Sequence, residues 1–214
     1  MPPGRRGKYL GFVAHEIKNP LATALWSCDL LKRMDAADRA GPRADKMIDA
    51  SLRALRRMRR LVDDYFTIER LQEHGYELRS ESVELRSLVE GAISQLGEKE
   101  GFVTRDWTVA ADGEVTGDPE MLKRAVRLAI EYVARASGSK PPRLSIEALD
   151  GAIRIGAETQ PAPLLPPAPE DRPTGDPTGG VLGFALAARI LEAHGGRIEE
   201  RDGALALLLE KAKT

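Results

Sequence analysis

Hydrophobic residues recur at helical spacing through the first third of the chain. Apolar side chains stand three and four positions apart over residues 10–31, which predicts an amphipathic helix from about residue 5 to 34. After a turn, a second apolar series over residues 47–68 predicts a helix that opens at Pro42 and continues to Gln72. Two long helices joined by a short turn form an antiparallel hairpin. One hairpin cannot cover so much apolar surface, so we expect two copies to close into a four-helix bundle, which makes the protein a homodimer.

From residue 76 onward the pattern changes to short strands alternating with helices. Asp118 can cap a helix whose first position is Pro119. The expected helices span residues 83–96, 119–136 and 182–194, and the expected strands span 76–79, 103–109, 144–146, 153–155, 197–201 and 204–210. These elements predict a layered α/β sandwich with helices on one face of a mixed sheet. The fold class is therefore α+β, with a helical hairpin domain over 1–75 and an α/β sandwich domain over 76–214.

Composition excludes several function classes. The 214 residues carry a net charge of -1 with a pI near 6.4, so neither nucleic acid nor an anionic membrane is an expected partner. No apolar run reaches the thickness of a bilayer, and the N-terminus lacks the apolar core of a signal peptide, which predicts a cytoplasmic protein. Cys28 is the only cysteine, so an internal disulfide and a cysteine-rich zinc site are both impossible.

A histidine on the first helix is the candidate for chemistry. His15, Glu16 and Asn19 fall beside the apolar stripe, and His15 and Asn19 are one helical turn apart. One imidazole nitrogen can attack phosphorus while an acceptor holds the other, and Glu16 is the natural acceptor. The amide of Asn19 can orient a water or a phosphoryl oxygen. Taken alone, such a histidine is most simply a surface residue of an amphipathic helix; as parts of the longer motif from His15 to Leu21, His15, Glu16 and Asn19 are expected to be catalytic.

The run from His15 to Leu21, His-Glu-Ile-Lys-Asn-Pro-Leu, resembles the phosphoacceptor box of two-component sensor histidine kinases. In those kinases the box lies in the dimerisation and phosphotransfer domain. The order of elements after residue 76 looks like their ATP-binding domain, so the resemblance covers nearly the whole chain. It implies response-regulator receiver domains as partners.

The second helix carries a cluster of five arginines between residues 53 and 60. One interpretation is a solvated helix face, whose long side chains lie over the bundle. The other is a docking surface, because counting back through the turn places the cluster level with His15 or just turnward of it. A receiver with an acidic phosphorylation pocket would dock there. The residues expected to contact it are Lys18, Leu21, Arg56, Arg59 and Arg60.

The resemblance fails at the ATP pocket. Such a pocket needs an asparagine for Mg²⁺, a carboxylate that reads adenine, and glycines that let the backbone approach phosphate. The family's spacing places two asparagines at Leu128 and Tyr132, and the adenine-reading aspartate at Ala157. Expected glycines are replaced by Thr159, Pro161 and Val181. We therefore expect no bound ATP, no metal site and no cofactor in this chain, with Mg²⁺ supplied by the partner receiver.

The predicted function is that of a histidine phosphotransferase in a phosphorelay. His15 would take a phosphoryl group from an aspartate of one receiver and pass it to another receiver without ATP. Two alternatives stay open. One is a response-regulator phosphatase in which Asn19 positions water, and the other is a non-enzymatic pseudokinase scaffold that binds receivers or a true kinase. A residual ATP-dependent histidine kinase is the least favoured interpretation.

Overall fold

The computed structural model describes residues 8–73, 76–96, 107–137, 144–157 and 180–211. The chain divides into two compact units, with the division between Glu69 and Arg70 near the end of the long helix α3. None of the helices within these described ranges is both long and apolar enough to cross a membrane.

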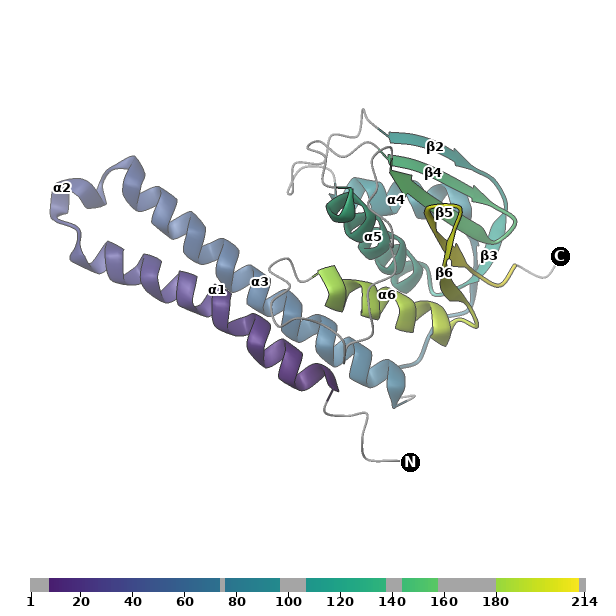
Figure 1. Cartoon of the computed structure of the whole chain (residues 1–214), viewed down its shortest axis with the longest axis horizontal. Helices are drawn as coiled ribbons and strands as arrows, with labels where there is room; N and C mark the ends of the chain where they lie inside the picture. The colour runs from purple at the N-terminus through teal and green to yellow at the C-terminus, as the bar shows by residue number, and fades with distance from the viewer. Residues whose placement is uncertain (1–7, 74–75, 97–106, 138–143, 158–179, 212–214) are drawn as a thin grey trace. The chain divides into compact units, whose positions relative to one another are not determined.

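The N-terminal unit is an antiparallel helical hairpin (Figure 1). Helix α1 (Lys8–Arg33) continues through Pro20, and the short helix α2 (Ala36–Arg39) connects it to α3 (Pro42–Gln72). The predicted pair of long helices is confirmed, and the opening of the second one at Pro42 is also correct. Between the two helices, Cys28 Sγ lies 3.7 Å from Ser51 Oγ, which shows that these two positions lie opposite each other.

Helices α1 and α3 meet along rows of buried and half-buried side chains. Positions in each row alternate between intervals of three and four residues, which is the spacing of coiled-coil packing. The rows consist of Val13, Ile17, Pro20, Ala24, Ser27 and Leu31 on α1, and Ala44, Met47, Ser51, Ala54, Met58, Leu61, Tyr65 and Ile68 on α3.

A second apolar row on each helix stays exposed in the single chain. On α3 it follows the buried row by one position. The exposed members are Leu10, Leu21 and Leu25 on α1, and Ile48, Leu52, Leu55 and Phe66 on α3, with exposed fractions between 41% and 59%. Rows of large apolar side chains at the surface are typical of a surface that another protein covers.

The C-terminal unit contains a mixed sheet covered by helices on one face (Figure 1). Strand β2 is parallel to β4, and all other neighbours are antiparallel. The strand order is β2 (Trp107–Ala111), β4 (Leu144–Leu149), β5 (Ala152–Ala157), β7 (Ala204–Leu208) and β6 (Arg197–Arg201). The covering helices are α4 (Leu85–Leu96), α5 (Pro119–Ala136) and α6 (Gly180–Ala193). A small second sheet pairs β1 (Glu81–Glu84) with β3 (Glu114–Gly117). The predicted hairpin followed by an α/β sandwich is confirmed.

Alternation along the strands shows which face of the sheet is the core. In β4 every second residue is buried, starting at Leu144, and the residues between them are exposed. The buried Ile153 and Ile155 on β5 continue this apolar layer. Two-residue turns with positive φ at both positions close the hairpins at Asp150–Gly151 and Asp202–Gly203. Both hairpins agree with the prediction.

The strand predicted at residues 76–79 is wrong. The first strand of this unit begins at Glu81. The backbone N–H of Arg79 donates instead to the side chain of Asp118, at 3.2 Å, so it is not available to a neighbouring strand. The helix expected from Val83 begins at Leu85, because Val83 and Glu84 still pair with β3.

Candidate functional site

His15 lies on the solvent-exposed side of α1. Lys18 and Asn19 are also exposed and lie within about one turn of it, so the three side chains share one surface. The hydroxyl of Thr23 donates to the backbone oxygen of Asn19, at 3.1 Å. Because all three side chains are exposed on this surface, a partner protein can reach the imidazole, the ammonium group and the amide together.

Glu16 points the other way, into the hairpin. Its side chain is 1% exposed, and its Oε2 lies 3.4 Å from Nη2 of Arg57 on α3, whose side chain is 30% exposed. Burial of a carboxylate is costly unless a cation or hydrogen bonds compensate it, and Arg57 supplies such a cation. Two successive residues thus face different surroundings. The expected role of Glu16 as the acceptor that holds the imidazole stays a prediction.

The arginine cluster on α3 lies close to this level of α1. From the contact between Cys28 and Ser51, a count of twelve residues back along α1 and forward along α3 places Glu16 opposite Asp63. Arg60 is then three residues, about 4.5 Å, towards the turn. This position agrees with the placement of the cluster just turnward of His15.

The remaining arginines of the cluster are exposed. The side chains of Arg53, Arg56, Arg59 and Arg60 make no ion pair with another described residue. Leu21, the apolar member of the expected contact set, is 43% exposed. Their role in docking stays a prediction.

Leu128 and Tyr132, the two positions at which the resemblance to histidine kinases places asparagine, pack against helix α6. A Cβ placed on Gly183 would lie 3.1 Å from Cδ2 of Leu128, which is 5% exposed. The ring of Tyr132 lies against that of Phe184, with centroids 4.7 Å apart and planes inclined by 47°. Neither Leu128 nor Tyr132 has the amide oxygen with which asparagine coordinates Mg²⁺.

The other positions of the expected nucleotide pocket can be located in part. Ala157, at the end of β5, has only a methyl group where a carboxylate would be needed. Thr159 and Pro161 lie outside the described residues, as does the side chain of Val181. Within the described part of the chain, no group of three or more His, Cys, Asp or Glu residues is arranged to hold a metal ion.

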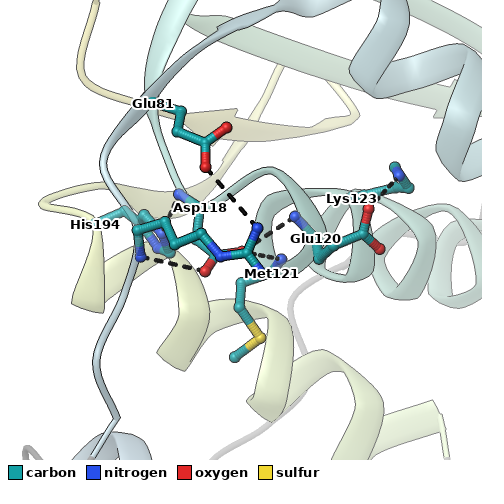
Figure 2. Close-up of polar contacts among 7 residues, drawn as sticks. Glu81, Asp118, Glu120, Met121, Lys123 and His194 are labelled. Atoms are coloured by element: carbon teal, nitrogen blue, oxygen red, sulfur yellow. Dashed lines mark hydrogen bonds and ion pairs between the residues drawn. The ribbon is translucent and has the colours of Figure 1, made fainter.

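Asp118 is the centre of a polar cluster in the α/β unit (Figure 2). Its Oδ1 accepts the backbone N–H groups of Glu120 and Met121, both at 3.1 Å, and so caps α5 as the sequence predicts. Its Oδ2 accepts the N–H of Arg79. The guanidinium of Arg79 in turn lies 3.9 Å from the carboxylate of Glu81. One side chain therefore ties the segment before β1 to the first turn of α5.

These contacts set the pKa of the Asp118 carboxyl. Burial alone raises the pKa, because it disfavours the charged form. The N–H groups of Met121, Arg79 and Glu120 and the positive charge of Arg79 outweigh burial, so the net pKa lies below the ordinary value. The folded domain thus favours the carboxylate form.

His194 completes the cluster from the end of α6. Its Nε2 accepts the backbone N–H of Asp118, at 3.1 Å, and its Nδ1 lies 2.7 Å from the carbonyl oxygen of Ile190. Because the carbonyl can only accept, Nδ1 carries the proton and donates it, which fixes the tautomer. No local sequence pattern indicates this contact, since the two partners are 76 positions apart.

Comparison with known proteins gives a consistent result. Residues 5–74 match the model of the His Kinase A (phospho-acceptor) domain family. The sensor histidine kinase MtrB of Mycolicibacterium paratuberculosis is 25% identical over 207 residues, which cover 90% of this chain. The aligned part is 36% of MtrB, so the chain spans about a third of the length of that relative.

Solved histidine kinase structures share the fold. The histidine kinase AdeS of Acinetobacter baumannii matches with a TM-score of 0.62 at 15% identity, over 93% of this chain and 98% of that one. Histidine kinase ThkA, solved in complex with the response regulator protein TrrA, matches with a TM-score of 0.60 at 19% identity, over 97% of this chain and 62% of that one. At these identities the likeness concerns the fold, a helical hairpin followed by an α/β domain.

Proposed function

The phosphoacceptor-domain match and the histidine kinase relatives support membership of this chain in the two-component sensor histidine kinase family, and from that premise we propose that it is a histidine phosphotransferase. His15 accepts a phosphoryl group from an aspartate of one receiver domain and passes it to another. One contrast carries the proposal. His15 is exposed on a surface with Lys18 and Asn19, whereas Leu128 and Tyr132, at which the resemblance places the metal-binding asparagines, pack against α6.

The transfer needs little from this chain beyond a positioned nucleophile. A ring nitrogen of His15 attacks phosphorus with its lone pair. The N–P bond forms as the P–O bond to the receiver aspartate breaks, and the aspartate leaves as a carboxylate. The second transfer reverses these changes on another receiver. Mg²⁺ held by the receiver neutralises charge on the phosphoryl oxygens, and Lys18 adds a positive charge beside His15.

The partner class follows from charge and from the fold. Arg56 and Arg60 are exposed cations close to the level of His15 and make no ion pair with a described residue. An acidic phosphorylation pocket complements such a surface. ThkA, which has the same fold, was solved with a response regulator, and this supports a receiver domain as the partner.

We also propose that the protein is a homodimer. The second apolar rows of α1 and α3 have the spacing of a helix-packing seam and are exposed in one chain. A second hairpin packed on those rows would give a four-helix bundle. His15 and Asn19 lie off the apolar row of α1 and stay accessible in such a bundle, whereas Lys18 and Leu21 lie along the row, where the second hairpin would pack.

Two measurements test the transferase proposal. The first is thermal unfolding with and without Mg-ATP. Ligand at about 100 times its Kd stabilises a protein by about 2.7 kcal/mol, so unchanged melting is the expected result. A clear rise in melting temperature, or self-labelling from ATP with no partner present, would overturn the proposal and restore an ATP-dependent kinase.

The second measurement uses a receiver phosphorylated with labelled phosphate. Label should move to the wild-type protein as acid-labile phosphohistidine, and should not move to His15→Ala. Asn19 is exposed one turn from His15, which also allows the phosphatase alternative. Release of inorganic phosphate that persists in His15→Ala and stops in Asn19→Ala would favour a phosphatase. Receiver binding with neither transfer nor release would favour a scaffold.

A further inference from the structure

The ion pair between Glu16 and Arg57 joins α3 to the residue next to His15. We propose that Arg57 is a positioning residue for the phosphoacceptor. Through Glu16 it fixes the rotation of α1 about its axis, and so the direction in which the imidazole points. This inference rests on the proposed function, because it concerns the orientation of the same nucleophile.

Helix geometry couples the two side chains. Successive residues of an α-helix differ by about 100° in direction, so holding Glu16 against α3 also fixes where His15 points. The exposures agree, since Glu16 is 1% exposed while His15 faces solvent. Without the Arg57 cation, burial of the carboxylate becomes more costly, and a rotation of α1 that exposed Glu16 would carry the imidazole with it.

The same turn of α1 lacks one hydrogen bond of its own. Pro20 has no backbone N–H, so it cannot donate to the carbonyl oxygen of Glu16 four residues earlier. The backbone around His15 is therefore less restrained by its own helix than an uninterrupted turn would be. A side-chain tie to α3 restrains the turn from outside.

Arg57 differs from its neighbours in the arginine cluster. Its Nε is buried and makes no hydrogen bond with a described residue. The contact between Nη2 and Glu16 therefore determines the orientation of the guanidinium group. Arg56 and Arg60 are exposed and make no ion pair with a described residue. Arg57 is thus expected to act on orientation, and its neighbours on docking.

A kinetic experiment separates the two roles. Single-turnover transfer from a labelled phospho-receiver is measured over a range of receiver concentrations, for wild type, Arg57→Gln, Arg57→Lys, Arg56→Gln and Arg43→Gln. Arg57→Gln should lower the maximum transfer rate about tenfold, because displacement of a nucleophile by about 1 Å can cost up to about 10²-fold in rate. The receiver concentration that gives half the maximum rate (half-saturation) should stay within about twofold of wild type. Arg57→Lys should recover most of the rate, because it keeps the charge. Arg56→Gln should raise half-saturation only, and the remote Arg43→Gln should change neither.

Nuclear magnetic resonance gives a readout that does not depend on transfer. The chain has three histidines, and His15→Ala identifies the imidazole ¹⁵N signals of His15. These signals should shift in Arg57→Gln, return towards wild type in Arg57→Lys, and stay unchanged in Arg43→Gln. If circular dichroism shows that Arg57→Gln loses helix content, the positioning role is judged on Arg57→Lys alone, whose His15 signals and transfer rate should stay close to those of wild type.

Three results would overturn the positioning role. They are unchanged His15 signals, an effect of Arg57→Gln on half-saturation alone, and losses that simply add when Arg57→Gln is combined with Glu16→Gln. Residues that act as one pair should instead give a double variant no slower than the more affected single variant. Wild type that takes no label from any receiver would end the proposed function, and the resonance test of Arg57 would still stand.

Discussion

Replacement of Asp118 by alanine should destabilise the α/β unit by an amount that the cluster in Figure 2 allows us to estimate. Loss of a helix N-cap costs about 1 kcal/mol, within a range of about 0.5–2. Asp118 is itself only 5% exposed and also accepts the N–H of Arg79, and a hydrogen bond to a charged group contributes about 1.5–3 kcal/mol. Together these give an expected loss of about 2–4 kcal/mol in the free energy of unfolding at pH 7.

The loss should depend on pH with a definite sign. The folded state lowers the pKa of Asp118, which means that it stabilises the ionised carboxylate more than the unfolded chain does. That stabilisation is complete above the unfolded pKa of about 3.9, and disappears as the pH falls through the lower folded pKa. The difference between wild type and Asp118→Ala should therefore be largest at pH 7 and smaller at pH 3.

Urea titration followed by circular dichroism measures the difference, and hydrogen exchange of α5 peptides assigns it to this unit. The matched control is Glu120→Ala, which removes an acid from the same helical turn. Glu120 is 66% exposed and pairs with Lys123 at 2.7 Å, an interaction worth less than about 1 kcal/mol. Equal losses in the two variants, or a loss in Asp118→Ala that does not shrink at pH 3, would refute the reasoning.

Three further predictions concern packing. Leu128→Asn combined with Tyr132→Asn should cost about 3 kcal/mol or more by removing contacts with α6, and calorimetry should show that Mg-ATP still leaves the melting temperature unchanged. Gly196→Ala would place a Cβ 2.2 Å from the carbonyl oxygen of Leu208 and should lower the free energy of unfolding, measured by urea titration, by about 3 kcal/mol. Gly203 has a φ of +70° but open space around it, so Gly203→Ala should lower the free energy of unfolding by only about 1 kcal/mol. Leu55→Lys should shift light-scattering mass towards that of a monomer, because it puts a charge in the exposed apolar row; an unchanged mass would argue against that row as the dimer seam.

The elements that could be predicted from sequence are those with a strong local signal. Both long helices follow from three-and-four spacing, and Pro42 marks the start of the second. The α5 cap follows from Asp118 and Pro119, and the Asp-Gly dipeptides mark both hairpin turns. In each case neighbouring residues alone determine the local conformation.

Contacts between distant segments could not be predicted in this way. Residues 76–79 have the composition of a strand, but the N–H of Arg79 finds a side-chain acceptor 39 positions later. The direction of Glu16 depends on Arg57, 41 positions away on the other helix. Helical spacing places Glu16 beside the apolar stripe but gives no sign of the cation on the opposite helix that compensates its buried carboxylate.

At the α5–α6 contact, the ring of Tyr132 lies against that of Phe184, at a position where the resemblance to histidine kinases would place a metal-binding asparagine. Both rings belong to the chain itself, so this contact forms when the domain folds. For a transferase built in this way, flux through His15 would follow the phosphorylation state of its receivers and would be indifferent to the ratio of ATP to ADP in the cell.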